Sequence, residues 1–567
     1  MTKIDDIYAA IRDADRPEVF ITLRPQADVA RDYQQSLASG GSLAGMTLAV
    51  KDNVDVAGLP TTAACPGYAY VPDADAPTVA ALRKAGAVVI GKTNLDQFAT
   101  GLVGTRSPYG AVRDSRRADR ISGGSSSGSA VAVALGFADI AIGTDTAGSG
   151  RVPAGLQGIV GVKPTVGAIS TVGIVPACAD YDVPTIFSAD FELANLATGV
   201  MAEANGERSF DSATRFAAPE APIIAVPAEL PELDDGWRVA FSDAVAAAEA
   251  AGFTIKTVDL TPFLAAARLL YDDALVSQRY DAVGEFIDSA ADSDNSADSN
   301  KVGLDPVVAQ IVSKASGYTA VDLLRARRRL AELRALAMDQ WGDATALMVP
   351  TAPFHPRIDE VAADPIGVNS RMGTYTNFCN LFDLCGLAVP AGVVDEADGT
   401  ESQFGITLLA GAHEDAVLIN LARRLRVSAT STRDSASLTM PTWPERVAPS
   451  VELAVFGAHM AGGPLTHELS GRGARWGREV RTASSYRLVA LDTTPPKPGL
   501  IRDVDAGRVI EGESWVLSPT AVGEFLAALP QPMMLGKVEL ADGDWVVGFG
   551  CDAQAGESGR PLERTRW

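Results

Sequence analysis

The sequence has 567 residues, with 71 acidic side chains against 48 basic ones and a formal net charge of −23. At roughly 150 residues per domain, that length predicts about four domains. A hydrophobic content of 47% supplies enough apolar material for a buried core and argues against general disorder. Because nucleic acids and anionic membranes bind basic surfaces, the excess of acid argues against both as partners.

The five cysteines are scattered without a CxxC pair, which favours reduced thiols and a cytoplasmic location. With four histidines and no HExxH motif, neither a metal nor a cofactor is expected. The start of the chain is polar, and the most apolar stretch, 130–138, is about half of the ~20 residues that a membrane helix needs. We therefore expect a soluble protein that acts on a small molecule, with a homodimer as one expectation for its assembly.

Strand and helix patterns alternate through the first part of the chain. In chain order they are a buried strand at 46–56, a helix at 77–86, a strand at 87–95, a Gly/Ser run at 123–129, an Ala/Val-rich helix ending at Gly136 and an apolar segment at 138–151. Strands that alternate with helices in this way predict an α/β domain with a largely buried sheet.

Longer elements follow, and after them the pattern changes to short strand-like runs. We predict a helix at 261–287, an acidic, Ser-rich surface loop at 288–300, a long amphipathic helix at 321–341, a strand at 346–353 and a helical segment through 373–392. Residues 424–450 have the Ser/Thr/Pro content of a linker, and short strand-like runs separated by Gly and Pro come after them. We therefore expect a large α/β domain at 1–430, a linker at 431–449 and a small β-rich (α+β) domain at 450–567.

The Gly/Ser run at 123–129 becomes informative only in combination with Lys51. Alone, such a run is usually a flexible turn or a phosphate-binding loop, and no GxxxxGK[ST] motif supports a nucleotide site. A serine nucleophile needs a base within hydrogen-bond reach, and no histidine is close in the sequence. A buried lysine with a depressed pKa can serve instead. Lys51, at the polar end of an apolar strand, is a candidate for that base.

Three segments resemble the amidase signature family: VKDN around Lys51, GGSSSGS from Gly123 and GTDTAGSGRVPAG from Gly143. The spacing also fits, because 125 − 51 = 74 and 149 − 125 = 24. The resemblance implies a mixed central sheet flanked by helices. It also implies that Lys51 is the base, that Ser125, preceded by a cis peptide bond, relays the proton, and that Ser149 is the nucleophile.

The resemblance further implies an oxyanion hole, in which fixed backbone donors stabilise the developing negative charge. Its four N–H groups would be those of Thr146, Ala147, Gly148 and Ser149. Ala147 and Gly150 depart from the Gly and Ile usual in the family, but both are small. Alone, Lys51 would be a solvated lysine and Ser149 a turn serine; matched order and spacing favour catalysis. Neighbouring residues are interpreted as structural, although three serines in a row leave the relay open; these neighbours are Ser126, Ser127, Asp145 and Arg151.

Tyr271 and Arg279 lie eight residues apart, about two turns on one face of a predicted helix. Alone, the pair suggests a helix packed on the core with its arginine in a surface salt bridge. The segment also resembles the LYxGPWVAERY stretch of the allophanate hydrolase family, in which the Tyr and Arg contact the substrate, although the Gly-Pro-Trp is absent here. An arginine fork suits a small anionic substrate because it can hold a carboxylate with two hydrogen bonds.

The predicted β-rich domain resembles the C-terminal domain of the same family. The matching runs are 455–460, 463–465, 486–488, 497–500 and 512–515. The resemblance implies that Ser149 attacks allophanate, that ammonia leaves, and that the C-terminal domain decarboxylates the N-carboxycarbamate produced. His459, in an expected small polar pocket, is the candidate proton-handling group, unless it is only a strand-end histidine bonded to backbone. Weaker candidates are Tyr486, Lys497 and Glu513, while His467 is expected on the surface.

Three alternatives remain open. One is an amidase for another small amide, such as a biuret- or indoleacetamide-like substrate. Another is an amidotransferase subunit, although the acidic composition gives no sign of a tRNA-binding surface. The third is a scaffold without activity, against which the intact set of Lys51, Ser125 and Ser149 argues.

Overall fold

The computed structural model describes residues 2–293, 303–396, 399–429, 440–494 and 496–567. They form two compact units, one of Met1–Arg208 with Ile223–Leu418 and the other of Ser209–Pro222 with Ile419–Trp567. Residues 431–439 of the predicted linker lie outside the described residues. The assignment of Ser209–Pro222 to the second unit was not predicted, because nothing in the composition of this segment distinguishes it from its surroundings.

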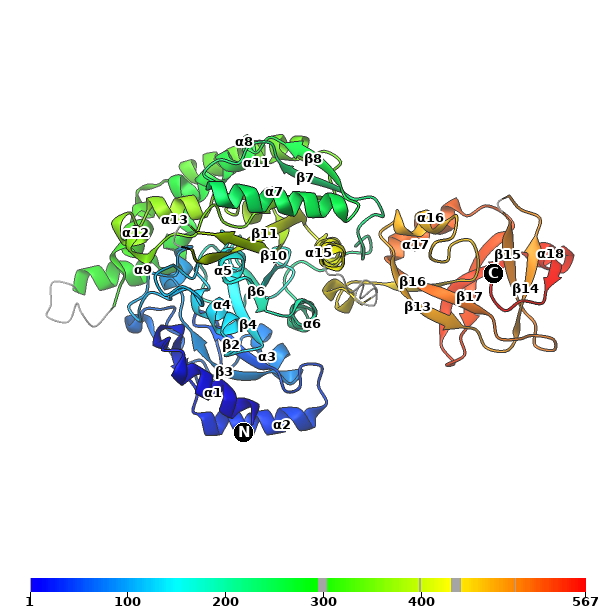
Figure 1. Cartoon of the computed structure of the whole chain (residues 1–567), viewed down its shortest axis with the longest axis horizontal. Coiled ribbons are helices and arrows are strands. Elements are labelled where there is room, and N and C mark those ends of the chain that lie inside the picture. The colour runs from blue at the N-terminus through cyan, green and yellow to red at the C-terminus, as the bar shows by residue number, and fades with distance from the viewer. Residues whose placement is uncertain (1, 294–302, 397–398, 430–439, 495) are drawn as a thin grey trace. The chain divides into compact units, whose positions relative to one another are not determined.

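An 11-stranded mixed sheet forms the centre of the first unit, which confirms the predicted fold class (Figure 1). In sheet order the strands are β1 (Phe20–Leu23), β3 (Val88–Thr93), β2 (Thr47–Lys51), β4 (Ile140–Asp145), β6 (Val183–Ser188), β5 (Val160–Lys163), β10 (Leu384–Asp395), β11 (Glu401–Gly411), β9 (Ala346–Pro350), β7 (Ile223–Pro227) and β8 (Thr254–Val258). Strands β3, β2 and β4 are parallel neighbours and are buried throughout. Burial on both faces explains why they read as continuous apolar runs.

The part of the chain up to residue 429 also contains α-helices. They are α1 (Lys3–Asp13), α2 (Gln26–Ser39), α3 (Pro77–Lys84), α4 (Ser127–Ala134), α5 (Val152–Gln157), α6 (Phe191–Ala202), α7 (Asp235–Ala250), α8 (Thr261–Asp272), α9 (Ser277–Ser293), α10 (Pro306–Ser313), α11 (Ala320–Trp341), α12 (Ile358–Ala363), α13 (Gly367–Met372), α14 (Phe378–Leu381) and α15 (Asp415–Ala429). Helix α4 contacts β2, β3, β4 and β6. Its residues are buried almost throughout, which explains why the Ala/Val-rich segment has no polar face.

Two predicted boundaries are wrong. The helix expected through 373–392 ends early, because Asp383 adopts a left-handed φ of 57° and β10 begins at Leu384. A short apolar run cannot be assigned to helix or strand by periodicity alone, and here pairing with β5 and β11 makes it a strand. The tract predicted as a loop from 288 is helical as far as Ser293, and residues 294–302 lie outside the described part.

The second unit contains two small sheets, in agreement with the short strand-like runs predicted for this part of the chain. One sheet has the order β13 (Arg475–Arg481), β16 (Glu511–Leu517), β12 (Val451–Val455), β18 (Trp545–Cys551) and β17 (Met533–Glu539); the other has β15 (Lys497–Arg502), β14 (Tyr486–Leu491) and β19 (Arg560–Leu562). The helices that follow α15 are α16 (Thr466–Ser470), α17 (Pro519–Ala528) and α18 (Ala553–Ser558).

Contacts explain why the segment Ser209–Pro222 belongs with the second unit. Phe216 and Ala217 both donate backbone N–H groups to the carbonyl of Gly473, and the ring of Phe210 packs edge-on against Trp443 at 5.3 Å. Among the helices that the structure describes, none is long and apolar enough to cross a membrane.

Candidate active site

Parallel strands β2 and β4 bring Lys51 into a buried polar cluster. Lys51 is the last residue of β2, and its neighbour β4 carries Thr144 near the same end. The Lys51 Nζ donates hydrogen bonds to Ser125 Oγ at 2.8 Å and to Thr144 Oγ1 at 2.7 Å. Because the carboxyl ends of parallel strands meet at one sheet edge, residues distant in the sequence converge there.

Burial dominates the electrostatics of Lys51. Its side chain is fully enclosed, and this loss of solvation lowers the pKa of the ammonium to about 7, against the opposing effects of the carboxylates of Asp96, Asp182 and Asp145. The guanidinium of Arg279 acts in the same direction as burial. A lysine in this state is substantially neutral at pH 7 and can accept a proton.

The Gly/Ser run presents Ser125 to Lys51 through a tightly packed backbone. The Gly124–Ser125 peptide bond is cis. A Cβ atom on Gly124 would lie 2.1 Å from Asp96 Oδ2, so only glycine fits there. The carbonyl of Ser125 accepts a hydrogen bond from the Asp96 backbone N–H at 3.1 Å.

The other two serines of the run have different partners. Ser126 Oγ donates to the carbonyl of Thr144 at 3.1 Å, and Ser127 Oγ donates to the carbonyl of Asn94 at 3.3 Å. Of the three consecutive serines, Ser125 is therefore the one that contacts Lys51. The sequence alone had left this choice open.

Asp145 organises the loop between β4 and α5. Its carboxylate accepts the backbone N–H groups of Gly148 and Gly150, at 3.0 and 2.9 Å, and two hydrogen bonds from the buried guanidinium of Arg151. Burial by itself would raise the pKa of Asp145, but Arg151 and these donors hold it below the usual value. The pair is structural in the way the sequence suggested, and it fixes the loop that contains Ser149.

This loop leaves three backbone donors without a protein partner. Within the described residues, the N–H groups of Thr146, Ala147 and Ser149 make no hydrogen bond, whereas that of Gly148 donates to Asp145. Gly148 has a φ of 140°, a conformation that favours glycine. Ser149 is 3% exposed, and its Oγ forms no hydrogen bond within the same set of residues. Of the two predicted relay links, the structure contains Lys51–Ser125 but no hydrogen bond between Ser125 and Ser149.

Tyr271 and Arg279 meet, although not on one helix. Helix α8 ends at Asp272, extended backbone at Asp273 follows, and α9 begins at Ser277. The Arg279 Nη2 donates to Tyr271 OH at 2.9 Å, and Nη1 donates to Thr100 Oγ1, also at 2.9 Å. Arg279 is 1% exposed, so the alternative of a surface salt bridge is wrong.

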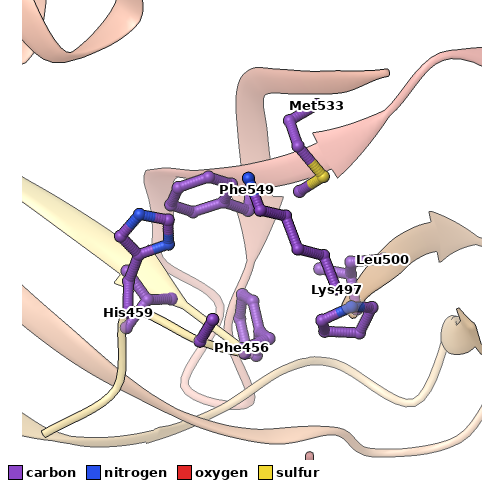
Figure 2. Close-up of a pocket in the computed structure, with 10 residues that line it drawn as sticks. Phe456, His459, Lys497, Leu500, Met533 and Phe549 are labelled. Carbon is purple, nitrogen blue, oxygen red and sulfur yellow. The ribbon is translucent and has the colours of Figure 1, made fainter. Parts of the chain in front are cut away.

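The second unit has its own pocket around His459, which Figure 2 shows. The His459 ring stacks on Phe549 at 4.9 Å, and its Nε2 contacts Glu468 Oε2 at 2.9 Å. Burial lowers the pKa of His459 although Glu468 opposes this. The lining is mostly apolar, with Lys497 as its second basic group, and this corrects the expectation of a polar pocket.

The three weaker candidates of this unit lie in different surroundings. Of the three, Lys497 is the one that lines the pocket with His459. The Tyr486 OH accepts the backbone N–H of Glu539. Glu513 binds the Ala461 N–H and the indole of Trp476. His467 is exposed, as expected.

Sequence reasoning missed several residues of the first site. Thr144, Asp96 and Asp182 each contact the cluster: Asp182 accepts a hydrogen bond from Thr146 Oγ1 and lies close enough to influence Lys51. Thr144 could have been found from its place at the end of a strand that neighbours Lys51. The other two lie on loops, where spacing gives no signal. The described residues contain no group of three or more His, Cys, Asp or Glu side chains arranged to hold a metal.

Two family models cover most of the chain. The Amidase model matches residues 18–419, and the Allophanate hydrolase C-terminal domain model matches residues 451–563. The urea amidolyases of Lachancea kluyveri and Saccharomyces cerevisiae are 40% and 39% identical over 95% and 93% of this chain. The chain spans only about 30% of the length of these relatives.

A solved structure matches along the whole chain. The allophanate hydrolase of Kluyveromyces lactis is 37% identical with a TM-score of 0.85, and the match covers 99% of this chain and 94% of that one. Sequence and fold thus agree over both parts of the molecule. The chain belongs to the amidase signature family and also carries an allophanate hydrolase C-terminal domain.

Proposed function

We propose that this chain hydrolyses allophanate at its amidase site and decarboxylates the product in its C-terminal domain, with ammonia and carbon dioxide as net products. The observation that carries the first part is the hydrogen bond from a fully buried Lys51 to Ser125. The similarity to an allophanate hydrolase over 99% of the chain supports the choice of substrate.

The proposed chemistry begins with a proton relay. Neutral Lys51 takes the proton of Ser125 Oγ, which takes that of Ser149 Oγ as Ser149 attacks the terminal carbamoyl carbon. The oxyanion forms opposite the unpartnered N–H groups of Thr146, Ala147 and Ser149. The Gly148 N–H joins them only if its bond to Asp145 opens. The relayed proton then passes to the leaving nitrogen, ammonia departs, and water releases the acyl group from Ser149.

Arg279 and Tyr271 are proposed to hold the substrate carboxylate. The Arg279 Nε is buried without a hydrogen-bond partner in the described residues, so this donor is available to an anion. Replacing Arg279 with Gln is expected to lower kcat/KM for allophanate by roughly 10- to 100-fold, because a charged hydrogen bond is lost. The neutral analogue malonamide should be much less affected, whereas equal losses on both substrates would assign Arg279 a purely structural role. Tyr271→Phe, which removes one hydroxyl, serves as the milder comparison.

His459 is proposed to act in the second step. Loss of carbon dioxide from N-carboxycarbamate requires that a proton reach the nitrogen. With Nε2–H directed at Glu468, His459 can take up a proton from solvent on Nδ1 and deliver it to that nitrogen as carbon dioxide leaves. His459→Ala is expected to leave release of the first ammonia from allophanate intact while slowing enzymatic release of carbon dioxide, and of the second ammonia that follows it, by about 10²-fold. Paired ammonia and carbon dioxide assays would measure this. Unchanged carbon dioxide release would end the assignment of His459.

The experiment that tests the whole proposal is a substrate panel on the intact chain. Ammonia release from allophanate is compared with release from malonamide, biuret and indoleacetamide. A kcat/KM for allophanate no higher than for the others would refute the specific assignment and favour another small amide. A cytoplasmic location and a homodimer stay predictions, which fractionation and sedimentation velocity would check.

A further inference from the structure

Two adjacent side chains beside the Ser149 loop carry buried oxygen atoms without hydrogen-bond partners. Thr376 Oγ1 and Asn377 Oδ1 are both inaccessible to solvent and unpaired within the described residues. Thr376 is 0% exposed and Asn377 is 6% exposed. Because leaving a buried polar group unpaired destabilises the fold, such atoms require an explanation, and a bound substrate is one that supplies the missing partner.

Thr376 packs directly on the backbone of the proposed oxyanion loop. A Cβ atom built on Gly148 would lie 2.4 Å from Thr376 Oγ1, so the hydroxyl rests against the Cα of Gly148. The backbone of Thr376 is also fixed, because its carbonyl accepts a hydrogen bond from Arg151 Nη1 at 3.1 Å. Arg151 in turn binds Asp145. The hydroxyl is thus fixed one residue from Ser149.

The residue after Thr376 lines an open pocket. Asn377 lines it together with Tyr271, whose hydroxyl binds Arg279. Thr376 therefore lies at the Ser149 loop, and its neighbour Asn377 lies at the pocket that contains Tyr271 of the proposed carboxylate-binding pair. A ureido acid bound between the Ser149 loop and Arg279 would present N–H donors along its length. Thr376 Oγ1 is an acceptor that has no partner among the described residues.

We propose that Thr376 is a substrate-binding residue whose hydroxyl accepts a hydrogen bond from a substrate N–H, which favours ureido acids. This inference rests on the proposed function. The substrate class is a small carboxylate that carries a carbamoyl group. The donor is either the central N–H of the ureido acid or the amide N–H of its scissile end.

Thr376→Val tests the proposal because it removes the hydroxyl and keeps the shape. With no partner to lose, the variant should have an unchanged or higher melting temperature than the wild type. Its kcat/KM for allophanate should fall by roughly tenfold. Malonamate, in which CH2 replaces the central N–H, identifies the donor: a loss confined to allophanate indicates the central N–H, and a loss on both indicates the scissile amide.

A matched control is Thr407→Val. Thr407 is also fully buried, but its Oγ1 shares a hydrogen bond of 2.9 Å with Thr351. This variant should melt at a lower temperature and keep its kcat/KM. An unchanged kcat/KM in Thr376→Val would overturn the proposal while allophanate hydrolysis by the wild type stands, and so would a lowered melting temperature. A wild-type chain inactive on allophanate would refute the proposed function and this inference with it.

Discussion

Replacing Ser149 with alanine is expected to lower kcat for ammonia release from allophanate by about 10⁴-fold or more. The variant retains Lys51, Ser125 and the backbone donors of the loop, but it has no atom that can attack the carbamoyl carbon. Because Ser149 Oγ has no hydrogen bond within the described residues, its removal costs the fold little. Single-turnover assays on purified protein, with melting temperatures in parallel, measure both effects.

The control for this experiment is a serine from the Gly/Ser run. Ser127→Ala removes a hydroxyl that bonds the carbonyl of Asn94. It should keep kcat within a few-fold of the wild type, because Ser127 contacts neither Lys51 nor the Ser149 loop in any hydrogen bond of the described residues. Full activity of Ser149→Ala would show that another nucleophile operates. A similar loss in both variants would point to general disruption of the site.

The parts of the site that lie on regular strands could be predicted from the sequence. Lys51 stands at the end of an apolar run, and β2 and β4 both appear as continuous apolar segments because each is buried on both faces. The resemblance to the amidase signature family then implied that Ser125 and Ser149 belong to the same site. The structure adds that Lys51 bonds Ser125 rather than Ser126 or Ser127, a choice that three identical side chains in a row could not reveal.

Features that depend on tertiary contacts could not be predicted. The apolar segment from Leu384 is a strand only because β5 and β11 flank it, and propensity does not encode that pairing. Thr376 is 227 residues from Ser149 in the sequence (376 − 149), so no local pattern associates the two. Folding brings Thr376 against Gly148, next to Ser149, and buries the unpaired hydroxyl to which the proposed substrate would hydrogen-bond.

Replacing Lys51 with methionine is expected to lower kcat/KM for allophanate by about 10³-fold or more, because the relay from Ser125 loses its base. The wild-type profile should rise with pH through about 7 and then level off, since burial lowers the pKa of Lys51 to about 7 and only the neutral amine accepts a proton. The limb centred near pH 7 should be absent from the residual activity of the variant.

Stability gives an independent check with a defined sign. In the unfolded chain the lysine pKa returns to its ordinary value of 10.5, so between about pH 7 and 10.5 the unfolded state binds more protons than the folded state. The contribution of Lys51 to the free energy of unfolding therefore increases with pH across this window, and Lys51→Met should lose that slope. Denaturant titrations at several pH values measure it. A wild-type activity profile that is flat from pH 6 to 9, together with the same stability slope in both proteins, would mean that Lys51 stays protonated, and the general-base assignment would fall.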